Sequence, residues 1–280
     1  MTKVDLHVHS NCSDGSNSIS ELIEIIKAND LKIFALTDHD TVSGCDKMEQ
    51  LTPKNIKFIK GVELTCITNG IKCHILGFNC DTKNKKLLDL IEKGKKLRRI
   101  KFETRVKYLK EILNIELTQD ELDWLNSRNS VTKTHFANIL VSRGLADNPV
   151  EAMQKYLDAC KTKNANFDAQ EAVNVLTEIG AIPVWAHPLG GEGEKHLSFD
   201  EFPKRLEHMI SLGIKGLECY YSRYNFEEIE FLKTCAKKHN LLISGGSDFH
   251  GKNKKDIVPA KLNINNELIT PEKLTILKYL

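Results

Sequence analysis

Histidines and carboxylates placed at intervals along the chain are the residues best suited to chemistry. His7 and His9 stand two residues apart in an extended segment, so both rings project from one face of a strand. Asp248 and His250 repeat this spacing near the other end of the sequence. Further ionisable residues follow predicted strands between these pairs, namely Asp14, Asp38, His39, Asp40, Glu63, His74 and His187. Imidazole and carboxylate without thiolate is a ligand set that suits Zn, Mn or Fe.

The number of these side chains favours metal chemistry over a structural role. A single histidine after a strand is commonly a hydrogen-bonded structural residue. Several strand ends that each deliver His, Asp or Glu are different, because ionisable groups are costly to bury together unless they pair or bind metal. The candidates are too many for one ion, which predicts two or three divalent ions (Mn²⁺, Zn²⁺ or Fe²⁺) with Glu63 as the bridging ligand. Such clusters activate water and clamp the oxygens of a transferred phosphoryl group.

The sequence lacks the signatures of other mechanisms. It contains no P-loop, no dinucleotide-binding Gly-x-Gly-x-x-Gly, no Gly-x-Ser-x-Gly elbow and no His-Glu-x-x-His. Water activated by metal needs no protein nucleophile, so we expect a metal-dependent hydrolase.

The elements that must position these residues alternate between strands and helices. Ser18 and Glu21 form a capping box ahead of helical spacing. Apolar runs predict buried strands at residues 3–9, 33–37, 58–64 and 73–78, and again at 181–186, 213–219 and 240–244. Thr270 with Pro271 at the first helical position predicts a last helix. Parallel strands with helices between them predict a barrel, whose carboxyl strand ends converge on one face.

A helical insertion interrupts this pattern. Polar helical stretches fill residues 83–165, which we expect to cover the active site, while 1–82 and 166–280 form the barrel. Residues 83–110 contain twelve lysines and arginines against three acidic residues. Two interpretations stay open: a solvated helix face, or an arm that attracts phosphate.

The composition excludes several classes of protein. Hydrophobic residues make up 41% and charged residues 28%, as in ordinary globular proteins, and the net charge of +2 gives no chain-wide affinity for polyanions. No apolar run approaches the ~20 residues that span a bilayer, so no membrane association is expected. The sequence opens without an apolar signal segment, and its eight cysteines contain no Cys-x-x-Cys pair. We therefore expect a cytoplasmic protein with reduced thiols.

Six motifs together resemble the polymerase and histidinol phosphatase (PHP) domain family. They are Asp5-Leu-His7-Val-His9-Ser10, Thr37-Asp-His39-Asp40, Gly61-Val-Glu63, His74-Ile-Leu-Gly77, Trp185-Ala-His187-Pro188 and Gly245-Gly-Ser-Asp248-Phe-His250-Gly251. Their order and positions agree with the family over nearly the whole chain. The resemblance implies an α/β fold, a distorted (β/α)7 barrel with a trinuclear metal site.

The resemblance also implies how the ligands are shared. The first metal would be held by His7, His9, Glu63 and Asp248, the second by Glu63, His74 and His187, and the third by Asp14, His39 and His250. Asp40 would orient a ligand imidazole. The residues expected to take part in catalysis are His39, Asp40, His187 and Asp248.

Within the family, the chain is most similar to stand-alone phosphoesterases that act on nucleoside 3′,5′-bisphosphates and on the 5′ ends of short RNA. Lys133-Thr-His135-Phe-Ala resembles their Arg-Pro-His-x-Ala element, which makes Lys133 and His135 expected substrate contacts. The chain departs from the pattern where Lys133-Thr134 replaces Arg-Pro and where Arg223, a further expected substrate contact, stands near the position of a frequent histidine. Because guanidinium matches phosphate geometry, a second phosphate has three candidate ligands that the sequence does not separate, Arg98, Arg99 and Arg105.

We therefore expect hydrolysis of a phosphate monoester, in a nucleoside 3′,5′-bisphosphate or a short oligonucleotide, by metal-bridged hydroxide. Three alternatives stay open. A histidinol-phosphate phosphatase would share the metal site but need no second anion pocket. An amidohydrolase-type C–N hydrolase would cleave amides, and an inert nucleic-acid-binding module should have lost ligands that this sequence retains.

Overall fold

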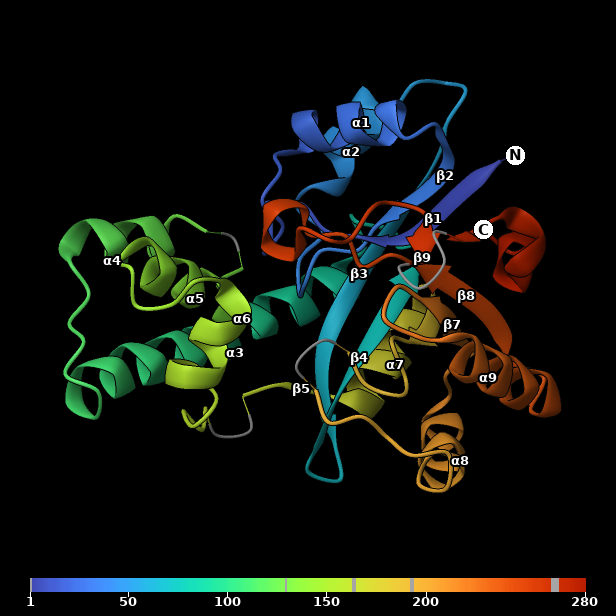
Figure 1. Cartoon of the computed structure of the whole chain (residues 1–280). Coiled ribbons are helices and arrows are strands. Elements are labelled where there is room, and N and C mark those ends of the chain that lie inside the picture. Colours follow the sequence, from blue (N-terminus) through green and yellow to red (C-terminus); the bar gives the residue numbers. More distant parts are fainter. Residues whose placement is uncertain (1, 129, 163–164, 192–193, 263–266) are drawn as a thin grey trace.

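The central sheet is a nearly closed barrel. The computed structural model describes residues 2–128, 130–162, 165–191, 194–262 and 267–280. Its strands are ordered β1 (Lys3–Val8), β2 (Leu31–Leu36), β3 (Lys57–Thr68), β4 (Ile71–Phe78), β6 (Ile182–Trp185), β7 (Gly216–Tyr221) and β8 (Leu242–Gly246), with β5 (Phe167–Asp168) paired to β3 (Figure 1). The chain after β8 returns to β1 through a parallel bridge between Val8 and Phe249. This arrangement confirms the predicted barrel.

One strand runs against the prediction. β4 is antiparallel to both of its neighbours, β3 and β6, so the parallel βα unit expected for residues 73–78 is wrong. The reason is the turn before it, where Asn69 and Gly70 both have positive φ, 49° and 73°, as in a two-residue hairpin. His74 consequently lies in the middle of β4, opposite Thr65 of β3, and not at the carboxyl end of a strand as expected. The hairpin still brings it to the barrel edge at which β3 ends.

Helices pack around the outside of the barrel. The predicted capping box begins α1 (Ile19–Ala28), whose apolar face buries Ile19, Leu22, Ile23 and Ile26. The others are α2 (Cys45–Leu51), α7 (Ala169–Glu178), α8 (Phe202–Leu212) and α9 (Phe226–Lys238). The helix predicted after Thr270 is instead two short 3₁₀ turns, Pro271–Lys273 and Thr275–Lys278, because Leu274 between them is extended.

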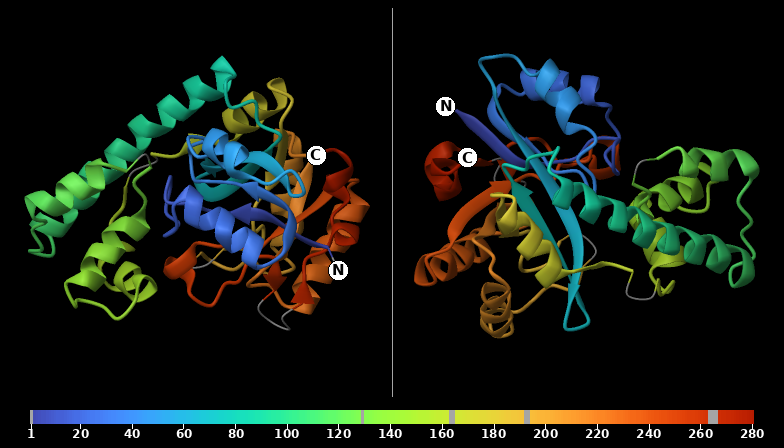
Figure 2. Two further views of the ribbon diagram at one scale, coloured as in Figure 1. Left: turned by 90° about the horizontal axis from the view of Figure 1, so that it is seen from above. Right: turned by 180° about the vertical axis from the view of Figure 1, so that it is seen from behind.

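A helical lobe projects from the barrel between β4 and β5. It contains α3 (Lys85–Glu111), α4 (Gln119–Asn126), α5 (Lys133–Ser142), α6 (Pro149–Ala152) and a π-helical turn at Met153–Leu157. Figures 1 and 2 show α3 leaving the barrel and the shorter helices packing beside it. The lobe has an apolar cluster of its own, which includes Phe102, Leu109 and Phe136, so it does not depend on the barrel core alone.

Two further observations concern membrane spans and cysteines. Among the described residues, no helix combines the length and the apolar character needed to cross a bilayer. All eight cysteines are free thiols in the structure.

Candidate active site

The predicted metal ligands converge at one end of the barrel. Side-chain atoms of His9, Asp14, His39 and His250 all lie within 4.8 Å of one another, although they come from loops after three different strands. Two more groups meet the same limit, His7 with His9 and Glu63, and His39 with Glu63 and His74. His187 lies beside them, its Nε2 3.1 Å from Glu63 Oε1. The structure thus brings these side chains together, and their assignment as metal ligands remains a prediction.

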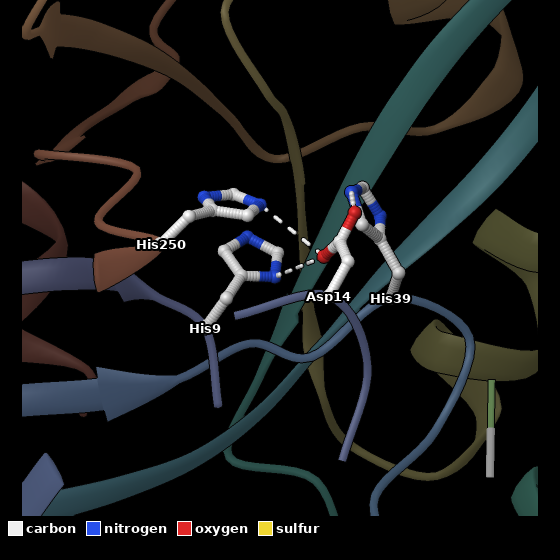
Figure 3. Close-up of side chains that lie close together, drawn as sticks. All are labelled: His9, Asp14, His39 and His250. Atoms are coloured by element: carbon white, nitrogen blue, oxygen red, sulfur yellow. Dashed lines mark ion pairs between the residues drawn. The ribbon is translucent and has the colours of Figure 1, made fainter. Parts of the chain in front are cut away.

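Asp14 lies between imidazoles (Figure 3). Its Oδ1 is 3.2 Å from His250 Nε2 and 3.8 Å from His9 Nδ1, and its Oδ2 is 3.9 Å from His39 Nε2. The rings of His9 and His250 stack with centroids 4.0 Å apart. Asp14 thus presents an oxygen to each side of a pocket bounded by three imidazoles.

Glu63 divides its two oxygens between different histidines. Oε2 is 3.3, 3.2 and 3.0 Å from ring nitrogens of His7, His9 and His39, in that order. Oε1 is 2.8 Å from His74 Nδ1 and 3.1 Å from His187 Nε2. Burial opposes ionisation, but the neighbouring imidazoles outweigh it and hold the pKa of Glu63 well below its usual value. A carboxylate that faces two ligand sets suits a bridging position.

Buried atoms without partners show that the cluster fits divalent cations. Nε2 of His7, His9 and His74, Nδ1 of His39 and Oε2 of Glu63 form no hydrogen bond among the described residues, although Glu63 Oε2 lies 3.0–3.3 Å from three of these nitrogens. Leaving a buried polar atom unpaired costs ~1–3 kcal/mol, and several such atoms converge here. A divalent cation would satisfy them together, and imidazole with carboxylate is a suitable donor set.

Glu218 contacts two of the clustered histidines, His7 and His187, and had no role assigned from the sequence. Its Oε1 is 2.8 Å from His7 Nδ1, and its Oε2 accepts the His187 backbone N–H at 2.8 Å. Glu218 thus occupies the Nδ1 side of the His7 ring, and His7 Nε2 faces the cluster. The available signal was its place in the predicted strand 213–219.

Asp40 does not orient an imidazole in the part of the chain that the structure describes. Its Oδ2 is 2.6 Å from Arg98 Nη2, and its Oδ1 accepts the Thr65 backbone N–H at 2.7 Å. Asp40 therefore joins the barrel to α3. Its catalytic role remains a prediction.

A cavity of about 400 Å³ extends from the predicted metal ligands to the helical lobe. One wall is cationic and consists of Arg98, Lys101, Arg105 and Lys133. Another is apolar and consists of Val150, Met153 and Leu157. The cavity thus combines a metal-ligand end, an anion-binding wall and an apolar wall.

Three of the cations share one face of α3. Arg98, Lys101 and Arg105 follow helical spacing, and each is at most 8% exposed. Arg98 is paired with Asp40, and Lys101 Nζ donates to Asn166 Oδ1 at 2.5 Å. Burial, with the nearby Arg98, lowers the pKa of Lys101 to about 7. Lys101 was missed from sequence because it reads as one more lysine of a polar helix.

Arg105 has no anionic partner among the described residues. Its guanidinium lies against the ring of Phe136, with Cζ 5.9 Å from the ring centroid. Burial, with the nearby Arg98, lowers the pKa of Arg105 to about 10. A buried guanidinium that faces a cavity without a counter-charge is costly unless a ligand supplies one.

Other expected substrate contacts lie elsewhere. Arg99 is exposed and binds Glu103 and Asn126, at 2.7 and 2.8 Å, outside the cavity lining. Arg223 pairs with Asp256, also outside the lining. One helical position, a rotation of 100°, separates Arg99 from the cavity-facing Arg98.

His135 and Lys133 differ in their relation to the cavity. Lys133 lines it and pairs with Asp158. His135 is buried behind it, where Nδ1 accepts the Thr132 N–H at 3.0 Å and burial lowers its pKa to about 4. His135 thus caps α5, and its expected contact with substrate is not seen in the lining.

Comparison with known proteins agrees with this geometry. Residues 5–178 match the family model described as the PHP domain. The chain is 31% identical to a 5′-3′ exoribonuclease of Haemophilus influenzae, over 89% of this chain and 90% of that protein. It is 26% identical to a 3′,5′-nucleoside bisphosphate phosphatase of Chromobacterium violaceum, over 92% of this chain and 91% of that protein. A structure of an amidohydrolase from Chromobacterium violaceum superposes with a TM-score of 0.83 over 99% of this chain and 95% of that one, at 24% identity, a likeness of fold alone.

Proposed function

The chain belongs to the PHP domain family and is a metal-dependent phosphoesterase, and we propose that its substrate is a nucleoside 3′,5′-bisphosphate. The observation that carries this proposal is Arg105, a buried cation without a counter-charge in the cavity that the metal ligands share. A substrate with two phosphates supplies an anion to each end of the cavity. Histidinol phosphate has one phosphate and would leave Arg105 unpaired.

The metal ligands are proposed to hold two or three divalent ions, Mn²⁺, Zn²⁺ or Fe²⁺, shared as the family resemblance implies. The first ion would take His7, His9, Glu63 and Asp248, the second Glu63, His74 and His187, and the third Asp14, His39 and His250. Bound ions of this kind lower the pKa of water to ~7 and so supply a nucleophile near neutral pH.

The surrounding residues hold the ligands in place. Glu218 directs the Nδ1 proton of His7 away from the cluster. Tyr221 donates its hydroxyl to Asp248 Oδ2 at 3.1 Å, which leaves Asp248 Oδ1 facing His9 and His250 at 3.4 and 3.3 Å. Residues 83–165 are proposed as the insertion that closes this end from water.

The cationic wall is proposed to bind the 5′-phosphate, which places the 3′-phosphoester at the metal ligands. A 5′-3′ exoribonuclease cleaves the ester on the 3′ side of a 5′-terminal nucleotide, and a nucleoside 3′,5′-bisphosphate is the smallest molecule with the same two groups. Arg105 would bind the 5′-phosphate through two parallel N–H donors of its guanidinium. The bound phosphate would in turn raise the pKa of Lys101, which would then be fully protonated.

The apolar wall supports a nucleoside over a simple sugar phosphate. Val150 and Met153 are half-buried and Leu157 is buried. They therefore offer dispersion contacts to the face of a nucleobase but no hydrogen bonds to the polar groups on its edge. Met153 and Leu157 belong to a π-helical turn, a conformation that is frequent at functional sites. We expect tolerance of all four bases.

A short RNA 5′ end is the second candidate, favoured by the 31% identity to the exoribonuclease. The lysines on the outer face of α3 give it little support, because most form ion pairs. Examples are Lys86 with Glu178, Lys93 with Glu171 and Lys95 with Glu92. That face is thus a solvated helix surface, and the buried face carries the anion-binding wall.

We propose a cytoplasmic location, in keeping with the free thiols.

Arg105→Ala tests the substrate assignment. We expect the KM for adenosine 3′,5′-bisphosphate to rise about 10- to 100-fold, since one charge-assisted contact contributes ~1.5–3 kcal/mol. Hydrolysis of adenosine 3′-phosphate, which lacks the 5′ group, should be unchanged by the substitution. Equal losses on both substrates would contradict the proposal.

A further inference from the structure

Lys254 lies beside the metal ligands but belongs to none of the sequence motifs. It ends the 3₁₀ turn Gly251–Lys254 and lines the cavity together with Asp14, Asp248 and His250. Its side chain is 19% exposed, and Nζ is 2.5 Å from Asp248 Oδ2. A lysine is therefore held where the cavity meets the cluster.

The turn that carries Lys254 is tied to both parts of the molecule. Asn253 Nδ2 donates to the Asp14 carbonyl at 2.7 Å, and Asn138 of α5 donates to Asn253 Oδ1 at 3.2 Å. The Lys252 N–H donates to Ser16 Oγ at 2.7 Å. Gly251 has a φ of 63°, and a Cβ there would lie 2.2 Å from Ser16 Oγ. The backbone is thus fixed, which limits where the ammonium can reach.

Asp248 keeps the lysine apart from the ligand atoms. Its Oδ1 faces His9 and His250, while its Oδ2 accepts from Lys254 and Tyr221. Lys254 thus contacts the carboxylate oxygen of Asp248 that faces away from the imidazoles of His9 and His250. The side chain of Lys254 also lines the cavity that Asp14, Asp248 and His250 share, so its positive charge lies beside the space where a phosphoryl group would bind.

We propose that Lys254 is a catalytic cation that binds the phosphoryl group under attack and the inorganic phosphate that leaves. Negative charge spreads over the equatorial oxygens of a transferred phosphoryl group. A cation already fixed by Asp248 and by the anchored turn stabilises that charge without reorganisation. This inference depends on phosphoester hydrolysis in this cavity and is independent of the nucleoside substrate.

The test compares Lys254→Met with Lys254→Arg, which keeps the charge, and with Lys255→Met as the matched control. Lys255 is the next residue, is exposed and does not line the cavity. Inorganic phosphate is titrated into each Mn²⁺-loaded protein by calorimetry, and bound metal is measured in parallel. Because the titration needs no turnover, failure of the proposed nucleoside substrate leaves its result intact.

We expect Lys254→Met to bind phosphate about 10- to 100-fold more weakly with unchanged metal content. Lys254→Arg should stay within a few-fold of the wild type, and Lys255→Met should equal it. Unchanged phosphate affinity in Lys254→Met would overturn the proposal, as would a loss of affinity that follows a loss of metal. If Lys254→Met does not fold, Lys254→Gln replaces it with the same expectations.

Discussion

Arg98 of the helical lobe binds Asp40 of the barrel, with Nη2 2.6 Å from Oδ2. Both side chains are buried, and Arg98 also reaches Thr65 Oγ1 at 3.4 Å and the Val131 carbonyl at 3.2 Å. The pair joins the cationic face of α3 to the loop that carries His39. This ion pair therefore contributes to the placement of the cationic wall relative to the predicted metal ligands.

Removing that arginine should destabilise the protein strongly. We expect Arg98→Ala to lower the free energy of unfolding by about 3–5 kcal/mol, because Asp40 is left buried without its counter-charge. Arg99→Ala is the matched control, since its pair with Glu103 is exposed and contributes ~0–1 kcal/mol. Chemical denaturation measures both. Equal effects of the two substitutions would show that the Arg98 pair does not hold the lobe.

Lys101 should make stability depend on pH. Its pKa is about 7 in the folded protein and ~10.4 when unfolded, so the unfolded chain binds more protons between these values. Stability relative to Lys101→Met should rise as pH increases from 7 to 10, and the cost of the buried charge is fully present below 7. Denaturation of the metal-loaded proteins at pH 6.5 and 9 measures the difference. A difference that stays constant between these pH values would mean that Lys101 has an ordinary pKa.

Removal of metal should lower stability. Chelation leaves the unpaired atoms of His7, His9, His39 and Glu63 buried together. Ligand binding at a thousandfold excess over Kd contributes ~4 kcal/mol, so the thermal midpoint should fall by about 5–10 °C and return when Mn²⁺ is restored. Glu63→Gln should respond less, because it lacks the shared carboxylate. A midpoint that ignores chelator in the wild type would argue against these atoms as ligands.

The apolar wall should affect nucleoside binding selectively. We expect Met153→Ala to raise the KM for adenosine 3′,5′-bisphosphate about 5- to 30-fold with little change in kcat, as for loss of ~1–2 kcal/mol of apolar contact. The same substitution should leave the KM for ribose 3,5-bisphosphate unchanged. Ile100→Ala, at an exposed position on α3, serves as control. A change in KM for both substrates would indicate distortion of the cavity instead.

The sequence predicted the candidate metal ligands well where they lie in or directly after strands. His7, His9, Asp248 and His250 were recognisable because spacing and strand ends place them on one face, which needs no knowledge of packing. The direction of β4 was not recognised, because an apolar run reads alike in either direction. The Asn69-Gly70 turn was the signal that was available.

Contacts made by the lobe were harder to predict because tertiary packing decides them. Arg98 and Arg99 are neighbours in a polar helix, and only the placement of α3 buries one and exposes the other. Lys101 and Lys254 read as surface lysines, since burial of a charge is set by what packs over it. Nothing local distinguishes Lys101 from the ion-paired lysines of α3.

Phosphate release from adenosine 3′,5′-bisphosphate in the presence of Mn²⁺ tests the central claim most directly, with His39→Ala as the blank. His39 Nδ1 is an unpaired buried atom 3.0 Å from Glu63, so its loss should disable the cluster. We predict stoichiometric release of phosphate and adenosine 5′-phosphate by the wild type, and at least a 100-fold lower rate in the variant, by analogy with the loss of a ~2.7 kcal/mol catalytic contact. Wild-type protein with confirmed bound metal that releases no phosphate would contradict the assignment of this substrate.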